Sequence, residues 1–180
     1  MISWPLAMTT FVAPNGVDAV SSATPLALMQ AGEGAALPSL WQMFIGQTSG
    51  SMGETCALAL LIGGLYLVIR KVISLRIPLV FIGTTAVFLL LFNGADLLLE
   101  NLLSGGLLLG AFFMATDYVT SPVTPWGQVV YAFGCGLLVA VIRTFGGYAE
   151  GVCFSILIMN LATPLIERIC RPRIYGEVKE

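Results

Sequence analysis

From about residue 50 onward the chain consists of long apolar blocks separated by short polar stretches. The blocks 51–70, 78–92, 128–145 and 149–169 each predict one helix, the last kinked at Pro164. The first block has about 19 residues, which at the rise of an α-helix span about 28 Å, close to the thickness of a bilayer's hydrocarbon layer. The pattern therefore predicts helices that cross a membrane.

The first 49 residues are rich in Ala, Pro, Gly, Ser and Thr and read as a loop segment with one short helix. Ser39 followed by Gln42 forms a capping box that opens this helix, and Gly46 closes it. We expect the helix to lie flat on the membrane surface. A second capping box, Ser51 with Glu54, is expected to open the first membrane helix.

Polar and glycine residues interrupt the apolar pattern between residues 93 and 106. Only about twelve residues, or roughly 18 Å of helix, then separate Gly105 from Asp117, too few for a layer of roughly 30 Å. The spacing predicts a short or broken helix. Such backbone is tolerated only where protein or a watery cavity covers it, and broken helices commonly build ion and substrate sites.

The basic residues indicate how the chain is oriented. The positive-inside rule places on the cytoplasmic side the two clusters formed by Arg70, Lys71 and Arg76, and by Arg168, Arg171, Arg173 and Lys179. Both can be cytoplasmic only if the broken segment also crosses, which gives about five crossings. We therefore expect an extracytoplasmic segment 1–49, a transmembrane helical domain 50–170 and a cytoplasmic tail 171–180.

The composition supports an all-α integral membrane protein, because 57% of the residues are hydrophobic, 10% are charged and the mean hydropathy is +0.92. A net charge of -2 offers no basic surface for nucleic acid. The absence of histidine excludes imidazole haem ligation, His-based triads and most zinc sites, and we expect no metal site. Redox chemistry would therefore need a bound cofactor.

The four cysteines show no C-x-x-C spacing, and most are expected to behave as small buried hydrophobes. Cys135 and Cys153 lie in successive predicted helices, so half of an iron–sulfur ligand set is the alternative.

Two acidic residues are candidates for an ion path. Asp117 ends the short helix, whose terminal carbonyls would attract a cation; the alternative is that it only caps the next turn, at Thr120. Glu54 would bind an ion at a membrane entrance, although its role in the capping box is the simpler interpretation. Arg143 and Glu150 flank a glycine turn and are expected to pair with each other.

The stretch from Asp18 to Thr24 is the strongest candidate for chemistry. Asp18, Ser21, Ala23 and Thr24 fall where flavinylated membrane redox subunits carry the pattern Asp-x-x-Ser/Thr-Gly-Ala-Thr, with Ser22 in place of the glycine. Thr24 would be the attachment site and its small neighbours would leave room for a transferase. The alternative is a Ser/Thr-rich turn whose extended backbone is imposed by Pro25.

Three further segments carry a family resemblance: 50–55, 110–117 together with Thr120-Ser-Pro122, and 143–151. With the threonine motif they are similar to the RnfD component of Rnf complexes, and more loosely to the NqrB component of sodium-translocating NADH:quinone reductase. The resemblance covers the chain but only about the C-terminal half of a typical member. We therefore expect a fragment, a truncated product or a split subunit, and the first residues read like the interior of a longer protein.

The resemblance implies a bacterial or archaeal cytoplasmic-membrane subunit of a complex that moves electrons between ferredoxin and NAD and couples this flow to sodium or proton transport. FMN would be attached to Thr24 through a phosphodiester by a flavin transferase, and a noncovalent riboflavin is allowed for. The fold would be one half of an inverted-repeat, urea-transporter-like architecture, and the partners would be the other Rnf subunits and lipid. This subunit is not expected to act alone. The competing classes are a nonredox channel or transporter, and a scaffold subunit, each with Thr24 unmodified.

Overall fold

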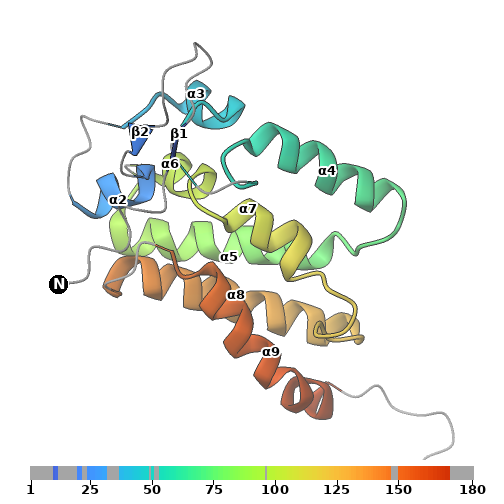
Figure 1. The fold of residues 1–180 in the computed structure, drawn as a ribbon. Helices are drawn as coiled ribbons and strands as arrows, with labels where there is room; N and C mark the ends of the chain where they lie inside the picture. The colour runs from blue at the N-terminus through green and yellow to red at the C-terminus, as the bar shows by residue number, and fades with distance from the viewer. Residues whose placement is uncertain are drawn as a thin grey trace, which may run out of the picture.

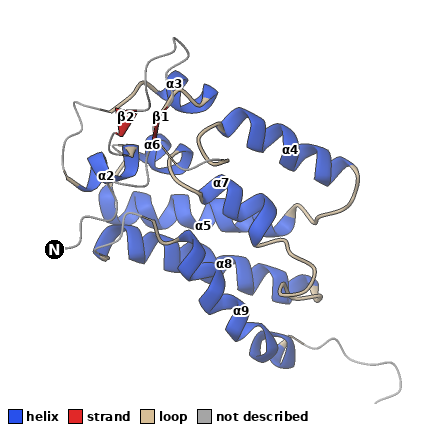
Figure 2. Ribbon diagram, viewed as in Figure 1, coloured by secondary structure: helices blue, strands red, loops and turns tan. Residues whose placement is uncertain are grey.

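The computed structural model describes residues 10–11, 20–21, 24–31, 37–48, 50, 53–95, 97–146 and 150–170. This part of the chain is helical except for two strands of two residues each, β1 (Thr10–Phe11) and β2 (Val20–Ser21), which pair antiparallel. Figure 1 shows the helices stacked side by side, and Figure 2 shows how little strand there is. The prediction of an all-α protein is confirmed.

Helices α5 (Arg76–Asn93) and α8 (Pro125–Phe145) form the centre of the bundle and run parallel to each other. At one end Ser74 Oγ donates to Gln128 Oε1 at 3.1 Å, and at the other end the rings of Phe92 and Phe145 lie 5.4 Å apart. We name the two ends of the bundle after the ends of α5: the Arg76 end and the Asn93 end.

Gly136 allows these two helices to approach closely. A Cβ at this position would lie 2.8 Å from the carbonyl oxygen of Phe81 and 2.7 Å from Cβ of Thr84. Thr85 Oγ1 donates to the carbonyl oxygens of Phe81 and Gly136, so its buried hydroxyl links the helices. The absence of a side chain at 136 thus lets α5 and α8 pack closely.

Helix α9 (Val152–Ile169) runs antiparallel to α8. Tyr131 OH donates to Asn160 Oδ1 at 2.5 Å, and the N–H of Val123 donates to Glu167 Oε1 at 3.0 Å. Pro164 lies inside α9, as expected from the sequence.

Because α5 and α8 are parallel, the chain between them must return along the length of the bundle. It does so through α6 (Leu98–Leu103), α7 (Leu107–Leu109) and the π-helix η2 (Gly110–Met114). The break between α6 and α7 contains Gly105 at φ 68°, a left-handed conformation that favours glycine. Beyond η2, Tyr118 OH donates to the carbonyl of Val72 at the Arg76 end. The predicted broken helix is confirmed.

The short helices give three outcomes. In α3 (Leu40–Ile45), the capping box of Ser39 and Gln42 and the left-handed Gly46 are confirmed. Helix α2 (Pro25–Gln30) is an element that the sequence pattern does not predict.

Helix α4 (Ala57–Ile69) begins six residues later than the predicted start at 51, because 53–55 form a turn with Gly53 at φ 96°. Ser51 lies outside the described residues, but the N-cap of α4 is Cys56, which makes no side-chain cap hydrogen bond, so the predicted helix start at 51 was wrong.

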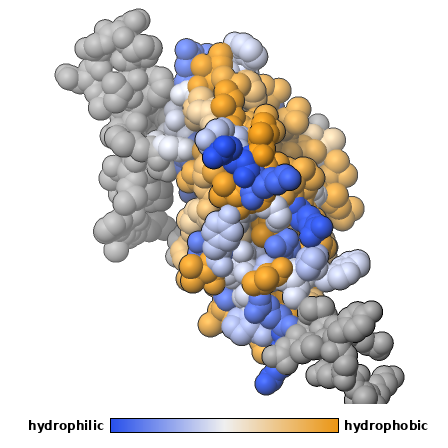
Figure 3. All heavy atoms as spheres, turned by 90° about the vertical axis from the view of Figure 1, so that its right-hand side faces the viewer, coloured by the Kyte–Doolittle hydropathy of each residue, from blue (hydrophilic) through white to orange (hydrophobic). Residues whose placement is uncertain are grey.

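Three described helices, α5, α8 and α9, are long and apolar enough to cross a membrane, and α4 is shorter, with 13 residues. Their outward faces carry large apolar side chains, such as Leu161 and Ile169, each 84% exposed. The described cationic residues other than Arg143 lie at the Arg76 end. Figure 3 shows this end of the molecule, with hydrophilic residues in blue across the middle and lower part and hydrophobic residues in orange at the top and right. The chain is thus a multi-pass membrane protein; five crossings and the cytoplasmic tail, whose residues 171–180 lie outside the described part, stay predictions.

Candidate functional site

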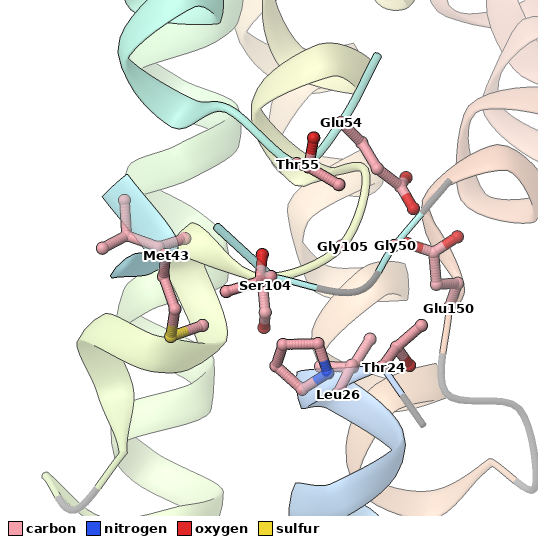
Figure 4. Close-up of a pocket in the computed structure, with 12 residues that line it drawn as sticks. Thr24, Leu26, Met43, Gly50, Glu54, Thr55, Ser104, Gly105 and Glu150 are labelled. Carbon is pink, nitrogen blue, oxygen red and sulfur yellow. The ribbon is translucent and has the colours of Figure 1, made fainter. Parts of the chain in front are cut away.

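The Asn93 end brings together segments that are far apart in the sequence around a small cavity of about 20 Å³, large enough for one water molecule or ion. The turn at 104–106 between α6 and α7 forms its floor, and Thr24 and the segment 53–55 lie around it (Figure 4). The lining residues are Thr24, Pro25, Leu26, Met43, Thr48, Gly50, Glu54, Thr55, Leu103, Ser104, Gly105 and Glu150.

Thr24 is the N-cap of α2. Its backbone is extended, with φ -67° and ψ 151°, as expected for a residue before proline, and its hydroxyl accepts from the N–H of Ala27 at 3.2 Å. The signal for this helix is present in the sequence: a threonine cap, proline at the first helical position and good helix formers after it. Of the other predicted motif residues, Asp18 and Ala23 lie outside the described part of the chain, and Ser21 lies in β2 with its side chain not described.

Glu54 lies in the turn before α4 rather than inside a helix. Its carboxylate reaches across to the break in the return segment, where a Cβ on Gly106 would lie 3.1 Å from Glu54 Oε2. Figure 4 shows the carboxyl groups of Glu54 and Glu150 pointing toward each other. The sequence suggests an ion-path role for Glu54 but gives no reason to place it beside Glu150.

Glu150 is bound to the same turn, because its Oε1 accepts from the N–H of Gly106 at 2.7 Å. A Cβ on Gly105 would lie 2.6 Å from this oxygen, so a side chain there would displace the carboxylate. The residue is exposed as a whole, but its carboxyl end is partly withdrawn from water. This burial, and then the negative charge of Glu54, raise the pKa of Glu150 above its usual range, although Gly106 N–H and Arg143 act in the opposite direction.

Arg143, in the last turn of α8, is only 6% exposed. Its Nη1 donates to the carbonyl of Asn101 at 2.5 Å and its Nη2 to that of Ser104 at 3.2 Å. These carbonyls come at the end of α6, so the guanidinium caps the helix just before the break. The sequence predicts a pair with Glu150; Arg143 does interact with Glu150 through charge, but its described hydrogen bonds go to the backbone.

A second, larger cavity of about 490 Å³ is lined by Arg143. Its walls come from α2, α6 and the last residues of α5 and α8: Leu26, Met29, Gln30, Asn93, Leu97, Asn101, Arg143, Thr144 and Gly146. Leu26, in the helix that Thr24 caps, lines both cavities.

Asp117 lies far from this site, at the Arg76 end. It is exposed, its Oδ2 accepts from Thr120 Oγ1 at 3.2 Å, and its carbonyl accepts from the N–H of Ser121 at 3.1 Å. This is the turn geometry that the sequence leaves open as the alternative. The two ion-path candidates, Glu54 and Asp117, therefore lie at opposite ends of the broken return segment.

All four cysteines are free thiols; Cys135 is buried in α8, whereas Cys153 is exposed on α9. Among the described residues, no group of three or more Cys, Asp or Glu side chains is arranged to hold a metal ion.

The raised pKa of Glu150 predicts how stability depends on pH. A carboxyl group whose pKa is higher in the folded state binds its proton more tightly there, so the stability that this proton contributes is fully present below the unfolded pKa and is lost as the pH rises through the folded pKa. Glu150→Gln keeps the oxygen that accepts from Gly106 and removes the charge. We expect the variant to melt at a higher temperature than the wild type in detergent at neutral pH, and the difference to disappear below about pH 4, the ordinary range of a glutamate.

Glu54→Gln is the matched variant for this prediction, because it removes the other charge of the facing pair. The double variant is expected to gain less than the sum of the two single gains, since either substitution alone relieves the repulsion. A melting temperature of Glu150→Gln that is equal to or below that of the wild type at neutral pH would contradict the raised pKa.

Comparison with known proteins extends over almost the whole chain. The sequence model of the family described as NQR2, RnfD, RnfE matches residues 1–176. The chain is 52% identical to the D component of the Na(+)-translocating ferredoxin:NAD(+) oxidoreductase complex of Acetobacterium woodii, in an alignment that covers 99% of this chain and 56% of that protein.

Two other relatives carry similar names. The D component of the proton-translocating ferredoxin:NAD(+) oxidoreductase complex of Clostridium ljungdahlii is 44% identical, over 98% of this chain and 58% of that protein. The D component of the ion-translocating oxidoreductase complex of Stutzerimonas stutzeri is 42% identical, over 93% of this chain and 51% of that protein. The chain thus spans about half the length of the curated relatives it matches.

Proposed function

The chain belongs to the NQR2, RnfD, RnfE family, and we propose that it is a membrane subunit of an Rnf-type complex that couples electron transfer between ferredoxin and NAD to sodium or proton transport. The observation that carries the proposal is the 52% identity, over 99% of this chain, to a relative named as a component of a sodium-translocating ferredoxin:NAD oxidoreductase complex. A proton-translocating relative at 44% identity supports the same activity with a different ion.

Thr24 carries FMN in this proposal, through a phosphodiester made by a flavin transferase. The donor is a flavin nucleotide activated as a phosphoric anhydride: Thr24 Oγ1 bonds to the flavin-side phosphorus, the anhydride bond breaks, the other phosphate leaves, and the hydroxyl proton passes to a base of the transferase. Asp18, Ser21 and Ala23 would contribute to recognition of the segment. The attached flavin would supply electron transfer, while the protein positions it.

The chain's own residues would set the environment of this cofactor. Thr24 caps α2 next to the small cavity, and Arg143 fixes the end of α6 by binding two carbonyls. The candidates for the ion path are Glu54, at this end of the broken segment, and Asp117, at its other end. Short interrupted helices like these place backbone dipoles inside the membrane.

The membrane arrangement follows from the same proposal. The basic Arg76 end and residues 171–180 would be cytoplasmic, and Thr24 would face the outside of a bacterial or archaeal cytoplasmic membrane. The chain would form one half of an inverted-repeat, urea-transporter-like fold and would assemble with the remaining Rnf subunits. A noncovalent riboflavin could bind between the halves.

The test uses the unaltered chain, co-expressed with an active flavin transferase. A fluorescent band on a denaturing gel is expected, since a covalent flavin survives denaturation, and mass spectrometry should place a flavin phosphate on the peptide that contains Thr24. A nonfluorescent band with an unmodified Thr24 peptide would overturn the flavin proposal and favour the competing classes, a nonredox channel or transporter, or a scaffold subunit.

A further inference from the structure

A cavity of about 500 Å³ at the Arg76 end has no part in the proposed function. It is lined by the end of α4, the α4–α5 turn, the start of α5, the segment after η2 and the first turn of α8. Its volume is usual for a ligand site. We infer that this cavity binds the phosphate of an anionic phospholipid headgroup through Lys71 and Gln128. The polar lining residues are Lys71, Ser74, Thr116, Tyr118, Ser121 and Gln128.

The hydrogen bonds of the lining leave donors for an anion. Gln128 Oε1 accepts from Ser74 Oγ at 3.1 Å, which leaves the two N–H donors of the amide nitrogen without a partner among the described residues. The N-cap of α5 is Leu75, so no side chain caps this helix and the N–H groups of its first turn are open to a ligand. Lys71 adds an ammonium group with three donors.

The charges around the cavity also favour an anion. Arg70 and Arg76, both exposed, are neighbours in the sequence of residues that line it. Its described lining contains no acidic side chain. The two acidic residues described at this end bind elsewhere, because Asp117 Oδ2 accepts from Thr120 and Glu167 Oε1 accepts from the N–H of Val123.

Lys71 has a backbone conformation that favours glycine, with φ 57°. It follows Arg70, the C-cap of α4, in a Schellman motif: the N–H of Val72 donates to the carbonyl of Leu67 and that of Lys71 to the carbonyl of Val68, each at 2.9 Å. A lysine at this position strains the backbone. Stability of the turn therefore does not explain the side chain, whereas binding of an anion does.

The apolar surface beside the cavity indicates a lipid rather than a free phosphate. Val68, Val72 and Leu75 belong to the lining, and the neighbouring Ile69 and Leu79 are 69% and 60% exposed. Acyl chains would cover this surface while the phosphate occupies the polar part of the cavity. Basic sites between membrane helices are a usual means of binding anionic lipid headgroups.

Lys71→Gly separates binding from folding. The full chain in detergent is titrated with dioleoylphosphatidylglycerol, and native mass spectrometry measures the bound lipid. We expect the affinity to fall about fivefold, the effect of one basic residue on an anionic lipid. The melting temperature in lipid-free detergent should equal or exceed that of the wild type, because glycine adopts the left-handed conformation without strain. Arg168→Gln removes the same charge at the same end but outside the lining, and should leave the affinity nearly unchanged.

Gln128→Glu is a second variant that does not involve the turn. It keeps an oxygen that can accept from Ser74 Oγ and replaces the two amide donors with a negative charge. We expect a larger loss of phosphatidylglycerol binding than in Lys71→Gly. Two further ligands test the chemistry on the wild type: dioleoylphosphatidylcholine, which has no net charge, and glycerol 1-phosphate, which has no acyl chains. Both should bind much more weakly than phosphatidylglycerol.

Equal affinity of the wild type, Lys71→Gly and Gln128→Glu for phosphatidylglycerol would overturn the inference. Equal affinity of the wild type for phosphatidylcholine would overturn it as well. Binding of glycerol 1-phosphate as tight as that of the lipid would show that the cavity takes a soluble phosphate ester and that the assignment to a lipid is wrong. None of these results depends on covalent flavin at Thr24, so this inference and the proposed function can fail separately.

Discussion

Replacing Thr24 by alanine is expected to abolish covalent flavin completely. Alanine has no hydroxyl to form the phosphodiester, and Ser21 and Ser22 lie outside the position that the motif assigns to the attached residue. The substitution also removes the N-cap of α2, in which Thr24 Oγ1 accepts from the N–H of Ala27, at a cost of about 1 kcal/mol. In-gel fluorescence of the denatured variant, made together with the flavin transferase, is the measurement.

Because Thr24→Ala changes both chemistry and folding, two matched variants separate these effects. Thr24→Asn keeps a good N-cap without a hydroxyl, so we expect α2 to stay folded and the flavin to be absent. Thr24→Ser keeps both the cap and a hydroxyl, and should retain part of the labelling. A fluorescent band from Thr24→Asn would show that the flavin is attached elsewhere.

Replacing Arg143 by methionine is expected to lower the free energy of unfolding by about 3 kcal/mol or more. The side chain is 6% exposed and satisfies the carbonyls of Asn101 and Ser104, which would be left without these donors. The facing carboxyl groups of Glu54 and Glu150 would also lose the nearest positive charge. Methionine keeps the unbranched apolar stem of the side chain but does not reach the carbonyls, so the loss reports mainly the hydrogen bonds, the charge and the contacts of the guanidinium. Thermal unfolding of the chain in detergent measures the effect.

Arg70→Met is the control for this prediction, because Arg70 is exposed at the opposite end of the bundle and its replacement should change stability by less than about 0.5 kcal/mol. Arg143→Lys should be intermediate: it keeps the charge, but one ammonium group cannot reproduce the fork that reaches two carbonyls. Equal unfolding temperatures for wild type and Arg143→Met would mean that the end of α6 does not depend on this side chain.

The elements that the sequence predicts well are those fixed by neighbouring residues. The capping box of Ser39 and Gln42 and the left-handed Gly46 follow from contacts three or four residues apart, and the structure contains them as expected. The broken return segment is also predictable, because polar residues and glycines interrupt an apolar run that is too short to span a membrane. The sequence predicts from the positions of the basic residues that this segment crosses the membrane. The parallel arrangement of α5 and α8 gives a separate reason, because the chain between two parallel helices must return along their length.

The site is harder to predict because its contacts join distant parts of the chain. Glu54 and Glu150 are separated by almost one hundred residues, and nothing local indicates that both reach the turn at Gly106. The two capping-box patterns look equivalent in sequence, and that of Ser39 opens α3, whereas α4 begins only after Cys56, beyond a turn with Gly53 at positive φ. Similarly, Arg143 lies 42 and 39 residues from the carbonyls it binds. The local sequence therefore indicates that such residues are candidates for the site, but it does not indicate which distant residues they contact.

The parallel arrangement of α5 and α8 has a consequence for how the protein is made. These two helices, and α9 after them, are long enough to enter the bilayer from the translocon on their own, whereas the helical pieces between α5 and α8 are the six residues of α6 and the continuous run Leu107–Met114 of α7 and η2. Segments of that length cannot partition into lipid alone, because their ends would expose unpaired peptide groups. The return segment must therefore enter the bilayer together with its neighbours, so that integration of this region and its tertiary folding are a single biogenesis step.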